Sequence, residues 1–405
     1  MSVQTAPRID VFDPDGFVPG IPFEMFDWMR AEAPAYFHPE PDGPGFWCLT
    51  RYDDVVQATR AWHLHSSAKG SNIPNFYEAE PGVLMMMINA DPPYHTKLRN
   101  LVRKGFTPRM VAALEPHVRE LCARIIDPVA PLGRCDFVTD VAAELPLQVI
   151  CELLGIPERD RHLIFKWSND MMGMDDPEYG NTFEGAQAAA FAMFEYMQAL
   201  AERRRQKPRV DLVSVLVDAD VEGERLTEME YQMFVVLLSV AGNETTRNAV
   251  SGGLLALIEH PEQRDRLIGD PALIPSAVEE ILRWTTPVMH FRRTATQDVE
   301  LHGETIRSGD KVVLWYISAN RDEAAFPDPY RFDVSRDPNE HVTFGGGGPH
   351  FCLGFAFARM EIEVMLEELL KRMPDAELAG PVSRLRSNWI NGLKHLPIRY
   401  APSKG

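Results

Sequence analysis

The sequence predicts a mainly α-helical protein with a smaller β region, on the strength of two periodicities and one absence. Apolar residues recur at helical spacing from Tyr94 to Trp284, and alternation of the strand type follows Pro287. No internal repeat or linker divides the 405 residues, so we expect a single domain over 1–405. We place the helical portion at about 94–285 and 355–373, and the β-rich portion at about 20–60, 288–320 and 380–400.

The composition excludes several classes of protein. With 45% hydrophobic and 25% charged residues, the chain has the composition of a globular protein rather than a disordered one. Its 41 Lys and Arg against 59 Asp and Glu give a net charge of −18, so we expect no nucleic-acid partner. The cysteines lack C-x-x-C spacing, which argues against a disulfide framework and a zinc ribbon. They are Cys48, Cys122, Cys135, Cys151 and Cys352.

The sequence carries no sign of export or of membrane insertion. Its first residues show no basic segment followed by an apolar one, as a secretory signal would. The longest apolar stretches, such as Met233–Gly242, reach about half of the roughly 18 residues that a membrane span needs. We therefore expect a cytoplasmic protein with no membrane span.

The first hundred residues alternate loops with short elements. The run Gly45–Thr50 is aromatic and β-branched enough for a strand, and a short helix is expected to begin at Tyr52. Little periodicity follows from Ser66 to Asp91, a stretch that contains Met86 and Met87. Two interpretations stay open for these methionines: they fill the core, or they line a hydrophobic pocket.

One long helix is predicted in the middle of the chain. Thr227 and Glu230 have the spacing of a capping box, in which each side chain bonds the other residue's amide. No proline interrupts the helical pattern from there to Pro261. About 32 residues at 1.5 Å each give a rod of roughly 48 Å, long enough to cross the molecule.

The middle of this helix is polar where a core helix should be apolar. It reads Ala241-Gly242-Asn243-Glu244-Thr245, and Gly242 alone costs about 1 kcal/mol relative to Ala. A glycine lets a flat ligand approach the backbone, and the Thr245 hydroxyl can bond the carbonyl one turn earlier. An acid beside an alcohol can deliver protons to a bound ligand. A polar patch that faces solvent is the equally weighted alternative.

A glycine-rich run ends at a cysteine near the C-terminus, in Phe344–Gly354. Four consecutive glycines bury no side chain and lose the most chain entropy, so they indicate close approach rather than packing. The following helix favours the thiolate form of Cys352 through its dipole. Zinc and iron–sulfur sites need several ligands, which leaves a nucleophile or a single axial ligand to haem iron.

These motifs together resemble those of cytochrome P450, a family of haem-thiolate monooxygenases. The resemblance covers essentially the whole chain, with the motifs in the family's order. The Cys352 loop resembles the haem-binding loop, and Ala241–Thr245 resembles the oxygen-activating groove. The resemblance implies the cytochrome P450 fold, a single large domain whose long central helix crosses the haem.

An E-x-x-R pair adds to the resemblance through its position. Pairs three residues apart are common on helices and contribute only about 0.2 to 0.5 kcal/mol. Glu280 and Arg283, however, lie about 70 residues before the cysteine, as the family's pair does. The resemblance implies that Arg331 completes a structural ion network with them, with Arg336 as the weaker candidate.

The implied cofactor is haem b, iron protoporphyrin IX, with Cys352 as the axial thiolate. Its two propionates need cations or hydrogen-bond donors when buried. The family's pattern maps propionate contacts onto His95, Arg99, Arg293 and His350. It maps further cofactor contacts onto Ala241, Gly242, Phe344, Gly345 and Gly354. One departure stands out, because Gly345 lies seven residues before the cysteine where the common form has Phe. Which side chain shields the sulfur therefore stays open.

The implied reaction inserts one atom of O2 into a C–H bond, while the other leaves as water. Glu244 and Thr245 would supply the protons. The chain has no dinucleotide fingerprint, so electrons should come from NAD(P)H through a ferredoxin reductase and a ferredoxin. Such an acidic partner would be attracted by the cluster Lys97, Arg103, Lys104 and Arg109. We expect the protein to be a monomer.

The motifs look most like those of the bacterial subgroup that oxidises chain ends of sterols, branched lipids and terpenoids. Candidate pocket residues are Met86, Met87, Leu237, Ala241, Val288, Met289, Trp389 and Ile390. Their apolar character favours a neutral substrate. Two other functions remain as alternatives: a peroxide-using haem-thiolate enzyme, and a haem-binding sensor without turnover.

Overall fold

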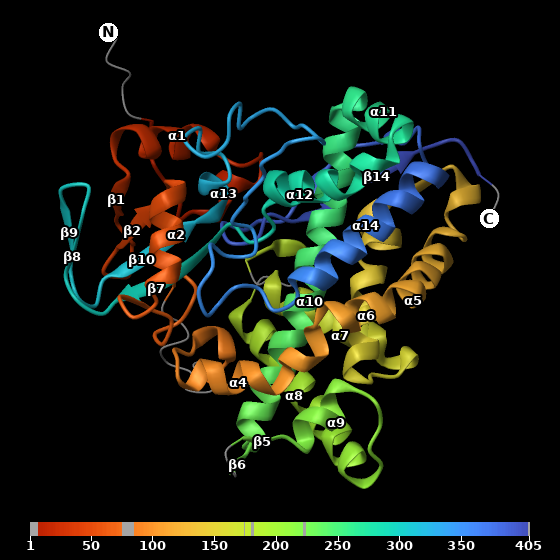
Figure 1. Cartoon of the computed structure of the whole chain (residues 1–405), viewed down its shortest axis with the longest axis horizontal. Helices are drawn as coiled ribbons and strands as arrows, with labels where there is room; N and C mark the ends of the chain where they lie inside the picture. The colour runs from red at the N-terminus through yellow and green to blue at the C-terminus, as the bar shows by residue number, and fades with distance from the viewer. Residues whose placement is uncertain (1–6, 75–84, 174, 180–181, 222–223, 404–405) are drawn as a thin grey trace.

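The computed structural model describes residues 7–74, 85–173, 175–179, 182–221 and 224–403 (Figure 1). Helices make up most of it, and the largest sheet lies to one side beside α1 (Phe23–Glu32) and α2 (Tyr52–Arg60). The prediction of a mainly helical protein with a smaller β region is confirmed. Much of the 66–91 stretch falls outside the described residues.

Although α1 and α2 fall within 20–60, which the sequence predicts as β-rich, most of the other described helices lie in the predicted helical portions. Between 94 and 285 they are α4 (Tyr94–Val102), α5 (Pro108–Ile126), α6 (Glu144–Leu154), α7 (Arg161–Met172), α8 (Phe183–Gln206), α9 (Leu212–Val217), α10 (Glu228–Glu259), α11 (Pro261–Gly269) and α12 (Ile274–Thr285). The short α13 (Tyr316–Ala319) and the long α14 (Phe355–Arg372) come later. In the described part of the chain, no helix combines the length and apolar character of a membrane span.

The strands form one sheet of five and several smaller ones. The five-stranded sheet has the order β1 (Ala35–His38), β2 (Phe46–Leu49), β10 (Lys311–Trp315), β7 (His290–Ala295) and β3 (His65–Ser66), and only the β2–β10 pairing is parallel. The other strands are β4 (Arg134–Asp136), β5 (Asp220–Val221), β6 (Glu224–Arg225), β8 (Val299–Leu301), β9 (Glu304–Ile306), β11 (Glu377–Leu378), β12 (Ser383–Arg384), β13 (Leu393–His395) and β14 (Pro397–Arg399).

Helix α10 runs through the centre of the helical part, as the sequence predicts (Figure 1). Its capping box is present, with Glu230 N donating to Thr227 Oγ1 at 3.2 Å and Thr227 N donating to the Glu230 carboxylate at 2.7 Å. Its apolar side chains join one core with those of α5, α6, α12 and α14. The helix is continuous over all 32 residues, polar middle included.

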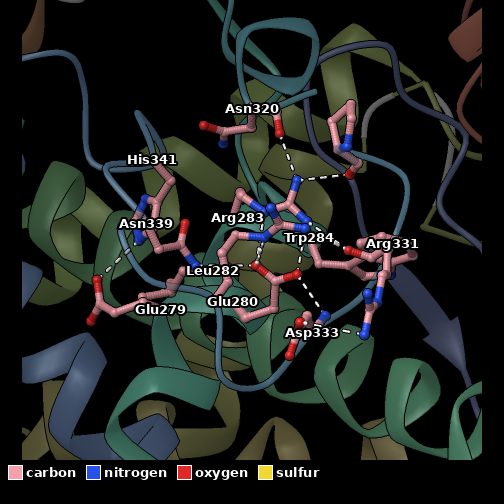
Figure 2. Close-up of polar contacts among 12 residues, drawn as sticks. Glu279, Glu280, Leu282, Arg283, Trp284, Asn320, Arg331, Asp333, Asn339 and His341 are labelled. Carbon is pink, nitrogen blue, oxygen red and sulfur yellow. Dashed lines mark hydrogen bonds and ion pairs between the residues drawn. The ribbon is translucent and has the colours of Figure 1, made fainter. Parts of the chain in front are cut away.

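The Glu280–Arg283 pair on α12 organises the loop that leads toward Cys352 (Figure 2). Both side chains are fully buried, and two hydrogen bonds of 2.8 Å join the guanidinium to the carboxylate. Arg283 also donates to the carbonyl oxygens of Asn320 and Pro329 at 2.8 and 2.9 Å. Glu280 accepts from the backbone of Asp333 at 2.9 Å. Because burying an incomplete ion network is costly, these partners fix the loop over α12.

The prediction that Arg331 completes this network is wrong. Its side chain is 63% exposed and approaches only Asp333, at 3.7 Å. Arg336 takes the predicted role instead, because its Nε donates to Glu280 at 3.2 Å and its side chain is only 9% exposed. Arg331 contributes its carbonyl oxygen, which accepts from Arg336 at 2.9 Å.

Candidate active site

The glycine-rich loop closes tightly against α2. Gly345, Gly347 and Gly348 all have positive φ angles, of 87°, 104° and 74°. A Cβ on Gly348 would lie 2.7 Å from the Thr59 carbonyl oxygen, so only glycine fits there. The loop ends where Cys352 N donates to the Phe344 carbonyl at 2.9 Å. The glycines therefore allow the loop to pack on α2 and return the chain to Cys352.

Cys352 differs from the other four cysteines in its electrostatic surroundings. Burial raises the pKa of Cys48, Cys122, Cys135 and Cys151 to about 12 in each case. Burial also raises the pKa of Cys352, but the Gly354 amide, Arg99 and Arg359 all act to lower it. Cations and an amide that favour the thiolate suit a metal ligand.

Cys352 lines a large internal cavity. The cavity holds about 1590 Å³ of space between atoms, open solvent at its mouth included. Side chains of α4, α6, α10 and α14 contribute to its walls, together with β7 and the glycine-rich loop. Helix α10, which the sequence predicts to cross the cofactor, contributes Leu237, Leu238, Ala241, Gly242, Thr245, Thr246 and Ala249.

The polar middle of α10 divides between the cavity and the protein interior. Thr245 lines the cavity, and its Oγ1 donates to the Ala241 carbonyl at 2.9 Å, as the sequence predicts. Gly242 lines it too, but a Cβ there would meet Ile150 of α6 at 3.1 Å. The glycine therefore serves helix packing as well as access to the cavity.

Glu244 does not line the cavity in this structure. Its side chain is 1% exposed and pairs with Arg247 one turn later. Arg247 in turn donates to the Asn169 side chain on α7 at 2.8 Å. Burial raises the pKa of Glu244, while Arg247 opposes that rise. Asn243 and Glu244 are buried, and Ala241, Gly242 and Thr245 line the cavity, so the alternative of a polar patch on the outer surface is not supported.

Basic side chains line the cavity, and they include Arg99, Arg293 and the histidines His95 and His350. Arg293 is 3% exposed, and among the described residues it forms no ion pair. His95 Nδ1 is buried without a hydrogen-bond partner among those residues, and burial lowers the pKa of His95 to about 4. The buried charge of Arg293 calls for an anionic ligand, and the neutral His95 ring calls for a hydrogen-bond partner.

Two of these side chains already have protein partners. Arg99 donates to the Phe351 carbonyl at 2.7 Å, which ties α4 to the cysteine loop. The ring of His350 lies 3.2 Å from Ser67 Oγ through Nε2 and also hydrogen-bonds the backbone of Ala90. The His350 ring packs against that of His95 in a tilted arrangement, with ring centroids 4.3 Å apart.

Of the predicted substrate-pocket residues, half line the cavity. Met87, Leu237, Ala241 and Val288 do so, whereas Met86, Met289, Trp389 and Ile390 do not. Met289 is fully buried in a separate core cluster that includes Trp315, so its place in the pocket is a wrong prediction. Successive side chains of an extended segment point to opposite sides, which explains why Val288 lines the cavity whereas Met289 lies in the core.

Sequence reasoning missed several cavity residues. Tyr316, Thr59, Phe291 and Ile150 reach the cavity only through the packing of separate elements, and no local pattern signals this. Glu361 on α14 also lines it, with a carboxylate oxygen that has no partner among the described residues. Burial raises the pKa of Glu361 to about 8. Its spacing from Cys352 could have drawn attention to it.

The fold and this cysteine-lined cavity define the class of the protein. The cytochrome P450 family model matches residues 45–270 and 272–373, and the chain belongs to that family. The chain is 45% identical to a methyl-branched lipid omega-hydroxylase of Mycobacterium tuberculosis, over 93% of this chain and 90% of that protein. It is 41% identical to a steroid C26-monooxygenase of Rhodococcus jostii, over 98% of this chain and 85% of that protein.

Solved structures agree with the sequence relatives. A Mycobacterium marinum cytochrome P450 in complex with pseudoionone superposes with a TM-score of 0.91 at 38% identity, covering 99% of this chain and 100% of that one. The protein is therefore a P450 monooxygenase, and its cofactor is haem with an axial cysteine thiolate. The site fits that group: Cys352 is the described cysteine that lines the cavity, and among the described residues Arg293 has no ion-pair partner and His95 Nδ1 has no hydrogen-bond partner, which the propionates would supply.

Proposed function

We propose that this P450 hydroxylates the chain end of a neutral sterol, methyl-branched lipid or terpenoid. The main support for this proposal is the chemistry of the side chains that line the cavity. Among the described residues, its basic side chains are Arg99, Arg293 and the histidines His95 and His350, the four that the family's pattern assigns to haem propionates. The rest of the wall is mostly hydrocarbon. No cation is thus left for a substrate carboxylate.

The energetics of burial favour a neutral chain. A carboxylate buried without a partner costs several kcal/mol, whereas each buried CH2 group contributes about 0.8 kcal/mol. Met87, Ile88, Leu237, Val288 and Phe291 supply apolar surface for such a chain. Affinity should therefore rise with hydrocarbon content and fall when a carboxylate is added.

The names of the relatives support the same substrate class. One relative is an omega-hydroxylase of methyl-branched lipids, and another is a monooxygenase at steroid C26. A solved relative binds pseudoionone. We extend to this chain what the two named activities share, oxidation of a lipid or steroid substrate.

We propose that Thr245 and Glu244 supply protons to the reaction. Haem, when bound, supplies the activation of O2, with one oxygen atom entering a C–H bond and the other leaving as water. Thr245 lines the cavity and can hold a proton at Oγ1 by exchanging its bond to Ala241. Glu244, a carboxylate in its pair with Arg247, must leave that pair and take up a proton from solvent before it can pass one to Thr245. The Arg247 pair would then control when the acid is free.

We further propose that the electrons come from NAD(P)H through a ferredoxin reductase and a ferredoxin, and that the protein acts as a cytoplasmic monomer. Arg103 and Arg109 are exposed, which is consistent with attraction of an acidic ferredoxin. The side chain of Lys104 lies outside the described residues. Product formation with a ferredoxin, its reductase and NADH, and none without the ferredoxin, would support this electron source.

One observation favours the peroxide-using alternative. Such enzymes do not need an acid beside the alcohol, and Glu244 is held by Arg247 away from the cavity. We therefore propose a direct comparison of the two oxidants. Turnover with hydrogen peroxide alone at the rate reached with electron donors would favour the alternative.

The substrate class can be tested by difference spectra with a matched pair of ligands, farnesol and farnesoic acid, together with cholest-4-en-3-one. We expect spin shifts with the neutral ligands and binding of the acid at least tenfold weaker. Val288→Phe should change these affinities, whereas Met289→Leu, the neighbour that points into the core, should not. Tighter binding of the acid, or no shift with any neutral ligand, would overturn the proposed class.

A further inference from the structure

Tyr316 places a buried phenol at the cationic part of the cavity. The residue follows β10 directly, is 2% exposed and lines the cavity with Arg293, which lies on neighbouring β7. Thr59 of α2 lines the same cavity as Tyr316 and Arg293. Burial raises the pKa of Tyr316, whereas Arg293 and Thr59 act to lower it. Neither Tyr316 nor Thr59 belongs to a sequence motif that pointed to the cofactor.

Thr59 and Tyr316 each have one hydroxyl hydrogen to donate, and the partner of the Thr59 hydrogen is known. Thr59 Oγ1 donates its hydrogen to the Val55 carbonyl at 2.7 Å, within α2. Thr59 can then only accept from Tyr316. The phenol hydrogen of Tyr316 is thus free either to bond Thr59 or to turn toward an acceptor in the cavity.

Within the described part of the chain, Arg293 forms no ion pair with a carboxylate, although Asp91 acts on it at longer range. The hydrogen bond that Arg293 makes among the described residues runs from Nη1 to the Arg292 carbonyl at 2.8 Å. His350 is another predicted propionate contact, but its ring already hydrogen-bonds the Ser67 hydroxyl and the backbone of Ala90. A carboxylate beside Arg293 would therefore need another donor, and a buried carboxylate is stable only when its oxygens are bonded.

We propose that Tyr316, supported from behind by Thr59, donates a hydrogen bond to the haem propionate that Arg293 neutralises. The same turn of α2 that carries Thr59 also supports the glycine-rich loop, since a Cβ on Gly346 would lie 3.0 Å from Val56 Cα. Helix α2 thus positions the cysteine loop and the phenol together. Tyr316 is a cofactor-positioning residue in this arrangement, remote from the substrate chemistry.

The experiment compares Tyr316→Phe with Tyr231→Phe in the haem-loaded protein. Tyr231 is a matched control, because its buried hydroxyl bonds the Met197 carbonyl at 3.1 Å in a different core. Two quantities are measured: the rate of haem transfer to excess apomyoglobin, and the propionate bending frequency by resonance Raman spectroscopy. Thr59→Val is a second variant that keeps the phenol and removes its support.

We expect Tyr316→Phe to lose haem at least roughly tenfold faster, the effect of one hydrogen bond to a charged acceptor, and to shift the propionate frequency. Thr59→Val should show a smaller change in the same direction, and Tyr231→Phe should match the wild type. The proposal is overturned if Tyr316→Phe leaves both quantities unchanged, or if Tyr231→Phe accelerates haem loss equally. If Tyr316→Phe does not fold, an unshifted propionate frequency in Thr59→Val overturns it instead.

Discussion

Glu244 and Arg247 form an ion pair on α10 that is almost completely buried, with side chains 1% and 4% exposed. Arg247 extends the pair to Asn169 on α7, so the central helix and its neighbour share one charged contact. Breaking one partner of a buried pair leaves an uncompensated charge. The same pair therefore stabilises the packing of α10 against α7 and determines whether the Glu244 carboxyl group is free to act as an acid.

Arg247→Gln should lower the free energy of unfolding by about 3 kcal/mol, because it leaves the Glu244 carboxylate without its counter-charge. Adding Glu244→Gln should restore part of that loss. Urea unfolding of both single variants and the double variant measures the coupling. Arg399→Gln, which breaks the exposed pair with Glu377, is the control and should cost less than about 1 kcal/mol. Equal losses for the two arginine variants would contradict a special role for the buried pair.

Thr245→Ala should keep the haem spectrum but separate electron consumption from product formation. The variant loses the hydroxyl that lines the cavity next to Ala241. We expect product per NADH to fall at least about tenfold, while NADH oxidation continues. Thr245→Ser, which retains a hydroxyl, is the control and should recover much of the yield. Full coupling in Thr245→Ala would exclude its role in proton supply.

Arg336→Ala should destabilise the protein by about 2 kcal/mol or more, because the buried Glu280 would lose a charged hydrogen-bond partner. Arg331→Ala removes a side chain that is 63% exposed and should change stability by less than about 0.5 kcal/mol. Thermal unfolding of the two variants compares them directly. The assignment of Arg336 to the network fails if the Arg331 variant is the less stable of the two.

His395 should make the stability depend on pH near neutrality. Its hydrogen bond to Asp136, aided by Glu178 and opposed by partial burial, raises the pKa of His395 above the usual 6.5. A raised pKa in the folded state gives stability that is complete below the unfolded value and is lost as pH rises through the folded one. We expect His395→Gln to remove this loss in urea titrations from pH 6 upward. His162→Gln, an exposed histidine of α7, should behave as wild type; an unchanged slope in His395→Gln would refute the assignment.

Local signals in the sequence predicted the local structure well. The capping box at Thr227 and the uninterrupted pattern to Pro261 specified the long helix, because capping and periodicity act within one element. The glycine-rich loop could be predicted equally well, since its four glycines and Cys352 lie close together in the sequence. These features required no knowledge of which elements pack together.

Contacts between elements could not be predicted in the same way. Arg331 and Arg336 lie in one loop, and only the path of that loop over α12 decides which side chain reaches Glu280. Glu244 was expected to serve the cavity, but α7 supplies Asn169, which helps to hold Arg247 beside it. Tyr316 reaches the cavity because β10 pairs with β7, a relationship between segments distant in sequence.

The most direct test of the proposed function is the position and origin of the oxygen in the product. The protein would be supplied with a ferredoxin, its reductase and NADH, together with a neutral methyl-branched substrate under ¹⁸O2. We predict a product hydroxylated at the chain end that carries one ¹⁸O atom, identified by mass spectrometry. Oxygen derived from water, or hydroxylation only at internal positions, would contradict the account.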